Sequence, residues 1–216
     1  MKQALIKLHI SVFLAGFTGI LGVLISLNEM SLVWYRIMIT VVSLSVLFKI
    51  TGKSAQLPKS TVIRFILIGC LIALHWVAFY GSIKLSNVSI GLVCFSATGL
   101  FTALLEPLLV TKKIQWAELG LGLISLLGIY LIFHFDQRYQ TGIIVGIISA
   151  FLAALFSVLN KRHVNKAEPL VIMLYELTGG LLVLTLLMPL YGYFFPEMSL
   201  IPTLSDWGWL LVLSWL

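Results

Sequence analysis

Long apolar stretches alternate with short polar segments along the whole chain, and this pattern predicts the fold. Seven stretches are each long enough to cross a bilayer, whose hydrocarbon core of about 30 Å needs roughly 20 helical residues. They cover residues 6–27, 31–50, 62–84, 88–110, 114–133, 142–161 and 170–194, and an eighth opens at Asp206 and Trp207 and is cut off at Trp215 and Leu216. Backbone polar groups cannot stay unpaired in lipid, and the alternation typical of a membrane barrel is absent. The expected fold class is therefore all-α, a polytopic membrane helix bundle.

The composition supports this prediction. Hydrophobic residues make up 60% of the chain and charged residues 10%, with a mean hydropathy of +1.09, whereas a soluble domain carries about 25% charged residues. Lys2 and Lys7 before an apolar run resemble a secretory signal, but the run lacks a small-x-small cleavage site and another span follows, which favours an uncleaved helix. Cys70 and Cys94 lie inside spans, so we expect no disulfide framework, no metal and no cofactor.

The distribution of Lys and Arg predicts the orientation, because short cytoplasmic loops are enriched in both. With a cytoplasmic amino terminus, the outer side keeps only Lys84 and Arg138. The inner side then holds Lys2, Lys7, Lys49, Lys53, Lys59, Arg64, Lys112, Lys113, Lys161, Arg162 and Lys166. The net charge of +6 thus reflects topology and not a nucleic-acid partner. We expect a multi-pass protein of the cell membrane, in contact with lipid.

A shift of 140 residues aligns two parts of the chain and indicates an internal repeat. It places residues 30–36 on residues 170–176, at the starts of the second and seventh spans. Small residues also recur at spacing four in the sixth span, where they favour close helix approach, at Gly142, Gly146, Ala150 and Ala154. The alternative is that any two membrane helices look alike. A five-span unit has an odd number of crossings, so its second copy must be inverted. The expected units are residues 1–136 and 137–216.

Several degenerate motifs carry a resemblance to a known family. They are Trp34-Tyr35-Arg36, the turn at 80–89, the run at 100–105 and the Gly-rich stretch at 120–132. With them the chain resembles EamA-type members of the drug/metabolite transporter superfamily. The resemblance implies five spans repeated, so the second repeat would be partial and truncated within the eighth helix. Two departures are Gly99, where the family often has Pro, and Lys112-Lys113, where it often has an acidic-basic pair.

Three charged residues inside the spans are candidates for substrate binding or coupling. An acid at a helix centre costs about 2.5–3.5 kcal/mol on insertion scales, so Glu106 must face protein or water. Glu106 lies beside Pro107, which cannot donate a backbone hydrogen bond. It serves either substrate binding or a proton relay, or else its side chain snorkels to the inner interface. Arg36 either holds a substrate carboxylate or snorkels outward. Direct contact between Arg36 and Glu106 is not expected, because their depths differ by about 15 Å. Glu176, the repeat counterpart of Arg36, either accompanies Glu106 or pairs with Lys112, Lys113 or Lys161.

Aromatic residues and one histidine complete the candidate set. His75 either couples protons near neutral pH or is a neutral histidine hydrogen-bonded inside the bundle. Trp76, Tyr80 and Trp34 either line a cavity for an organic solute or, for Trp34 and Tyr80, anchor the chain at the membrane interface. Tyr175 enters the candidate set beside Glu176 through the repeat alignment.

The motifs of hydrolases, metalloproteases and P-loop ATPases are absent from the sequence, so we do not expect an enzyme or an ATP-driven pump. The first hypothesis is a gradient-driven secondary transporter that moves a small organic metabolite, an amino acid or a drug-like solute, by alternating access. Efflux is the expected direction, with proton coupling through Glu106 or His75. The second hypothesis is a non-transporting integral membrane partner or assembly subunit. The oligomeric state stays open.

Overall fold

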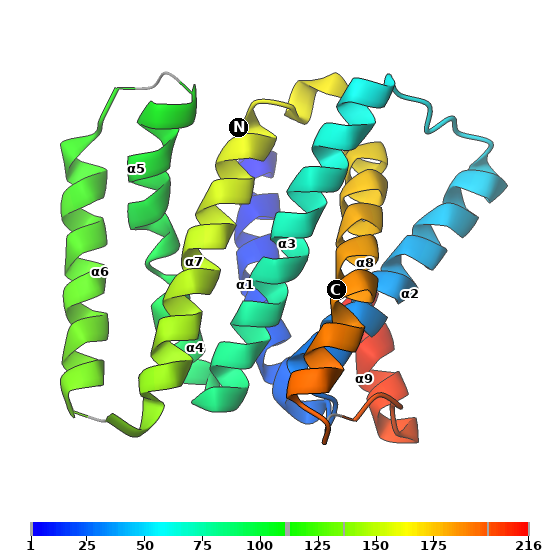
Figure 1. The fold of residues 1–216 in the computed structure, drawn as a ribbon. Coiled ribbons are helices and arrows are strands. Elements are labelled where there is room, and N and C mark those ends of the chain that lie inside the picture. Colours follow the sequence, from blue (N-terminus) through cyan, green and yellow to red (C-terminus); the bar gives the residue numbers. More distant parts are fainter. Residues whose placement is uncertain (1, 111–112, 136, 198, 216) are drawn as a thin grey trace.

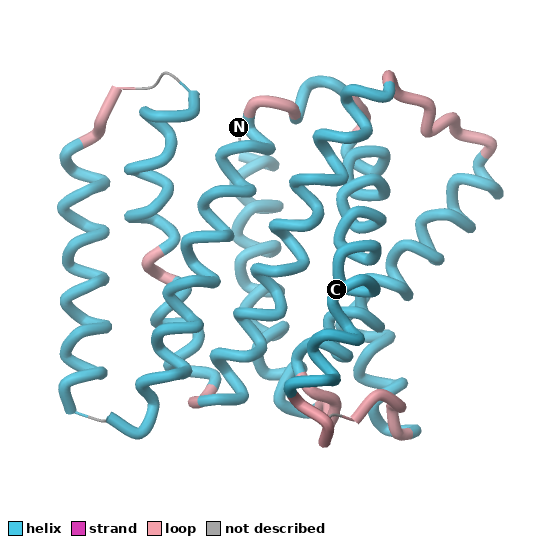
Figure 2. Tube along the Cα trace, viewed as in Figure 1, coloured by secondary structure: helices cyan, strands magenta, loops and turns pink. Residues whose placement is uncertain are grey.

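The computed structural model describes residues 2–110, 113–135, 137–197 and 199–215, and these residues form helices and short connections without a strand (Figures 1 and 2). The helices are α1 (Lys2–Leu24), α2 (Glu29–Thr51), α3 (Lys59–Leu85), α4 (Val88–Phe95), α5 (Thr98–Val110), α6 (Trp116–Phe135), α7 (Gln140–Lys161), α8 (Pro169–Phe194) and α9 (Leu204–Trp215). The prediction of an all-α fold is confirmed.

Six helical segments of the described residues are long and apolar enough to cross a membrane. They are Leu5–Leu24, Glu29–Thr51, Lys59–Leu85, Val88–Val110, Gln140–Lys161 and Pro169–Phe194. The apolar part of α6, Trp116–Leu131, is shorter, and α9 has 12 residues. The prediction of a polytopic membrane helix bundle is confirmed, with helix ends close to the predicted ones.

Loops gather at the two ends of the bundle (Figure 2). We call the end that holds the start of α1 the amino-terminal side, and the other end the opposite side. The α2–α3, α5–α6 and α7–α8 connections lie on the amino-terminal side, and the α1–α2, α3–α4, α6–α7 and α8–α9 connections lie on the opposite side (Figure 1). The chain therefore crosses the bundle alternately up and down, as the loop charges predict.

Local signals in the sequence set several helix ends. The Asn28 side chain accepts a hydrogen bond from the Ser31 N–H and caps the start of α2, and Asn87 caps α4 through the Ile90 N–H. Helix α2 ends at Gly52, whose φ of 64° is a left-handed conformation that glycine adopts without steric cost. These caps supply partners for backbone groups that the helices leave unpaired.

Helix α3 is the centre of the bundle and packs closely against α7 and α8. A β-carbon on Gly69 would lie 1.7 Å from the Glu176 carbonyl oxygen, and one on Gly179 would lie 2.2 Å from the Ile66 carbonyl oxygen. The α3 and α8 backbones are thus in direct contact, as small residues permit in membrane helices. On α7, all four small residues of the predicted stripe are buried, namely Gly142, Gly146, Ala150 and Ala154.

The fourth predicted span is broken into α4 and α5 at Ser96 and Ala97 (Figure 2). The backbone tightens there, with the Ala97 N–H donating to the Cys94 carbonyl three residues earlier. Hydroxyl groups of Ser96 and Thr98 donate to nearby carbonyls, which supplies donors where the regular helix ladder is interrupted. Helix α5 continues through Pro107 to Val110, so the interruption lies at Ser96 and not at the proline.

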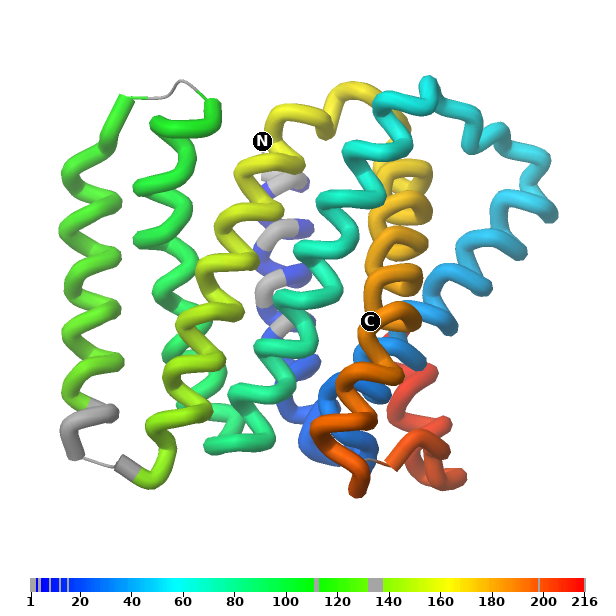
Figure 3. The backbone as a smooth tube through the Cα atoms, in the orientation of Figure 1, coloured from blue at the N-terminus to red at the C-terminus, as the bar shows by residue number. Residues whose placement is uncertain are grey.

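Polar contacts join the elements on the opposite side. Asp206, at the start of α9, accepts hydrogen bonds from the backbone and hydroxyl of Ser26 and from those of Thr203, at 2.7–2.9 Å. The Lys84 ammonium, at the end of α3, donates to carbonyls of the α1–α2 connection, and Tyr191 donates to Glu29. Figure 3 shows α9 returning beside the start of α2. These bonds tie α3 and α9 to the α1–α2 connection and α8 to α2 on this side.

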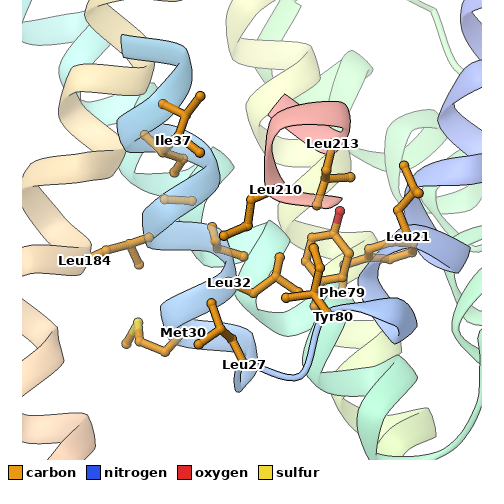
Figure 4. Close-up of a cluster of buried hydrophobic side chains, with 14 of the residues drawn as sticks. Leu21, Leu27, Met30, Leu32, Ile37, Phe79, Tyr80, Leu184, Leu210 and Leu213 are labelled. Carbon is orange, nitrogen blue, oxygen red and sulfur yellow. The ribbon is translucent and has the colours of Figure 1, made fainter. Parts of the chain in front are cut away.

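The main apolar core lies next to these contacts (Figure 4). Leu27, Leu32, Leu210 and Leu213 are fully buried there, and the Tyr80 ring packs among them with 1% of its surface exposed. Burial is uneven along α1, because its described side chains from Gln3 to Phe13 are exposed and the buried ones begin at Gly19. Helix α1 is therefore held by the bundle through its part nearest the opposite side.

Candidate functional site

A cavity of about 490 Å³ lies among α1, α2, α3 and α4. Its lining includes four of the residues selected from the sequence, Arg36, His75, Trp76 and Tyr80. The other lining residues are Gly16, Thr18, Phe79, Leu92 and Phe95. The cavity is mostly aromatic and apolar, with a few polar groups, which is the usual composition of a site for a small organic molecule.

Helix α3 supplies most of the cavity wall. His75, Trp76, Phe79 and Tyr80 fall at spacings of one and four, so they form two adjacent rows on one face of the helix. Gly22 of α1 makes room for this face, because a β-carbon there would lie 2.4 Å from the Tyr80 ring. The close approach of α1 at this glycine keeps the Tyr80 ring buried while its hydroxyl reaches the cavity.

Arg36 brings a positive charge to the cavity from α2. Its guanidinium carbon lies 4.2 Å from the centre of the Trp76 ring, and its Nη1 donates a 2.9 Å hydrogen bond to the Tyr80 hydroxyl. The ring face attracts the cation, and the hydroxyl fixes its orientation. No carboxylate of the described residues forms an ion pair with Arg36. A guanidinium has five N–H donors, so this arrangement leaves donors for an anionic ligand.

His75 is held by α7 and not by a charged group. Its Nδ1 lies 3.0 Å from the Ser149 carbonyl oxygen and 2.9 Å from the Ser149 hydroxyl oxygen; the carbonyl only accepts, so the bond to it requires the proton on Nδ1. The Ser149 hydroxyl can then donate to the His75 carbonyl, 3.2 Å away. With Nδ1 protonated, Nε2 of the neutral ring is an acceptor. The ring also stacks on Phe95 at a centroid distance of 5.5 Å, which links α3 to α4 beside the cavity.

The four remaining candidates lie outside the lining of this cavity. Trp34 donates its indole N–H to Thr185 on α8 at 2.9 Å, and the Tyr175 hydroxyl donates to the Ala55 carbonyl at 2.8 Å. Glu106 forms a 2.6 Å ion pair with Lys161, and Glu176 is buried between α8 and α3. Arg36 lines the cavity and Glu106 does not.

Two further outcomes concern the predicted partners of Glu176. Lys161 pairs with Glu106, and no lysine forms an ion pair with Glu176 among the described residues. Lys112, another suggested partner, lies outside the described residues. Among the described residues, Lys161 is thus the ion-pair partner of Glu106, and the proposal that Glu176 accompanies Glu106 stays a prediction.

Sequence reasoning missed five lining residues. Leu92, Phe79 and Phe95 are ordinary apolar residues of membrane helices, and their role depends on α4 facing α3, which no local pattern reveals. Gly16 carries a similarly weak signal. Thr18 is a polar residue in the middle of an apolar helix, and this signal could have identified it.

Together, the membrane-spanning helices and the charged intramembrane cavity define a multi-pass membrane protein of the transporter class. The chain belongs to the EamA-like transporter family, whose model matches residues 3–134, and this family is part of the drug/metabolite transporter superfamily. Comparison with curated proteins finds no match. A solved structure described only as the crystal structure of a protein is similar over 94% of this chain and 74% of its own, with 18% identity and a TM-score of 0.59. That similarity concerns the fold alone.

Proposed function

We propose that this protein is a gradient-driven secondary transporter of a small organic metabolite that carries a carboxylate, such as an aromatic or other apolar amino acid. Arg36 carries the proposal, since it places in an aromatic cavity among spanning helices a cation that forms no ion pair with a carboxylate of the described residues. A charged side chain within a membrane span is costly and is normally paired or functional. A ligand carboxylate would supply the missing counter-charge.

The dimensions and lining of the cavity support this substrate class. Its volume of about 490 Å³ falls within the range of roughly 300–1,000 Å³ that small-molecule sites occupy. Trp76, Phe79 and Phe95 offer apolar surface to a hydrocarbon or aromatic body, while Arg36 and the Nε2 of His75 offer polar contacts. The site would thus bind an anionic end and an apolar body together.

We further propose alternating access, with the amino-terminal side facing the cytoplasm and net movement outward. The bonds of Asp206 and Lys84 join helices on the opposite side, whereas the described side chains of α1 from Gln3 to Phe13 are exposed. These features support a conformation open toward the amino-terminal side. In this proposal residues 1–136 form one five-span unit, and residues 137–216 belong to its inverted copy.

A set of three ligands with one skeleton tests the substrate class. Phenylacetate is an anion, phenylalanine is a zwitterion and phenethylamine is a cation. We expect the first two to raise the unfolding temperature of the purified protein and phenethylamine to have no effect. The variant Arg36→Gln should lose the response to both carboxylates. Equal stabilisation by phenethylamine, or an unchanged response of Arg36→Gln, would contradict the proposed role of Arg36.

Transport is tested separately in proteoliposomes with labelled phenylalanine. Counterflow into vesicles preloaded with unlabelled phenylalanine is expected for the wild type and should be absent for Arg36→Gln. Binding without counterflow would refute the transport proposal and favour a non-transporting membrane partner.

A further inference from the structure

A second polar group lies apart from the cavity, near the amino-terminal side of α7 and α8. Three buried side-chain atoms of the described residues lack a hydrogen-bond partner, namely Asn160 Oδ1, His163 Nδ1 and Glu176 Oε1. Such atoms are rare in folded proteins, because an unmet acceptor loses its bond to water without compensation. Their occurrence on neighbouring elements therefore points to a site that takes up a hydrogen-bond donor or acceptor from its surroundings.

The group is enclosed by three elements. Glu176 lies seven residues into α8, about 10 Å along the axis from Pro169. Gly69 of α3 contacts its backbone, and the Glu176 side chain keeps 6% of its surface exposed. Asn160, near the end of α7, lies within hydrogen-bonding reach of the Glu176 carboxyl. His163 follows in the next turn, and its ring is nearly perpendicular to the Phe65 ring, with the two ring centres 6.4 Å apart.

The two oxygens without partners define what this site can bind. The amide N–H₂ of Asn160 is a donor and its Oδ1 is an acceptor, whereas an ionised carboxylate has only acceptors. With Glu176 ionised, Asn160 Oδ1 and Glu176 Oε1 are two acceptors without a donor. A proton on Glu176 Oε1 converts it into a donor that can return a bond to Asn160 Oδ1. One proton on Glu176 thus turns one of the two unpaired acceptors into a donor.

The charged neighbours do not supply a counter-ion for an ionised Glu176. Lys161 on α7 is paired with Glu106, and on α8 itself Glu168 is exposed and paired with Lys53. On α3, Arg64 is exposed. Partial burial, together with nearby Lys166, Arg64 and Arg162, lowers the pKa of His163, so this residue is neutral near pH 7 and is not a counter-ion. None of these groups forms an ion pair with Glu176.

We propose that Glu176 and Asn160 form a proton-binding site, occupied in this conformation, and that the proton bound there is the coupling ion. The coupling part rests on the proposed transport function. When α8 moves away from Gly69, water reaches the carboxyl, the O–H bond breaks and the proton passes to water on the amino-terminal side. The carboxylate takes up a proton again before the helices close. Glu176, and not Glu106 or His75, is the coupling residue in this scheme.

Infrared spectroscopy of the purified chain tests the proton site without any substrate. We expect the wild type at neutral pH to show the C=O stretching band of a protonated carboxylic acid. Glu176→Gln should lose the band, and the matched control Glu106→Gln should keep it. Asn160→Leu should keep the band but move it to higher frequency, because the carboxyl loses its hydrogen-bonded neighbour. Absence of the band in the wild type, its survival in Glu176→Gln, or an unshifted band in Asn160→Leu would overturn the proposal.

A second measurement addresses coupling in proteoliposomes with labelled phenylalanine. Glu176→Gln should retain counterflow but lose accumulation driven by a pH gradient, so that the internal level falls to the equilibrium value. Accumulation equal to that of the wild type would overturn the coupling role. If no protein variant moves phenylalanine, the transport proposal fails while the infrared result still decides the proton site.

Discussion

The contact between α3 and α8 permits a quantitative prediction for Gly69→Ala. The new β-carbon would lie 1.7 Å from the Glu176 carbonyl oxygen and 2.5 Å from its carbonyl carbon. Both obstacles are backbone atoms, so no side chain can rotate to relieve the clash. An ordinary contact begins at 3.4 Å, and the two helices must therefore separate along this face.

The magnitude follows from two opposing effects. Overpacking that moves a backbone costs about 3 kcal/mol. This figure includes the van der Waals contacts that are lost along the separated helices. Alanine in place of glycine favours the helix by about 1 kcal/mol. The net loss of about 2 kcal/mol corresponds to a decrease in Tm of roughly 4–8 °C for a chain of this size.

Thermal unfolding in a single detergent measures this effect, with Gly128→Ala as the control. Gly128 lies within α6, and nothing comes within 4 Å of a β-carbon built there, so this variant should show only the helix-favouring effect, up to about 1 kcal/mol. The two variants should thus change Tm in opposite directions. A Tm for Gly69→Ala equal to or above that of the wild type would refute the reasoning, because α3 and α8 would then not be in backbone contact.

Three further predictions concern other contacts. Asp206→Ala removes the acceptor shared by the backbone and hydroxyl donors of Ser26 and Thr203, two exposed residues whose freed donors water can reach, and should destabilise the protein by about 1–2 kcal/mol in thermal unfolding, whereas Asp206→Asn, which keeps one acceptor, should cost less. A double-mutant cycle on Glu106→Gln and Lys161→Gln should give a coupling of about 1 kcal/mol or less, because the lysine side chain is 52% exposed; a larger value would show that solvent does not screen the pair. Trp76→Leu should weaken phenylalanine binding about 3- to 30-fold, from a cation–π contribution of about 0.5–2 kcal/mol, while Trp34→Leu should bind like the wild type. Equal effects of the two tryptophan variants in a binding titration would argue against the cavity as the site.

The helices could be predicted because apolar length, loop charge and capping residues are local properties of the sequence. The break in the fourth span was missed, since Ser96 and Ala97 are unremarkable in a membrane helix, whereas Pro107, a residue of the type that most often interrupts a helix, lies inside α5. That proline lies near the end of α5, where only a few carbonyls remain to be paired. A single helix boundary thus depended on tertiary packing and not on composition.

The candidate site was predicted in part, for a related reason. Charged and aromatic residues are conspicuous within an apolar span, which is why the sequence indicates Arg36, His75, Trp76 and Tyr80, and all four line the cavity. Trp34 has equally conspicuous chemistry, but its position on α2 directs its indole toward α8. The face that a helix turns toward its neighbours is set by many weak contacts, and a single sequence does not report them.

The break at Ser96 and Ala97 also has a mechanical consequence. Helix α4 packs against α1, α3 and α7 and contributes Leu92 and Phe95 to the cavity, whereas α5 packs against α6 and α7. A continuous helix would transmit any tilt along its full length, but two short segments joined by a tight turn can pivot independently. Under the proposed transport function, a tilt of α4 at this turn would widen the cavity wall for a bulkier solute while α5 and α6 keep their place in the bilayer, which would make tolerance of substrate size a property of this joint.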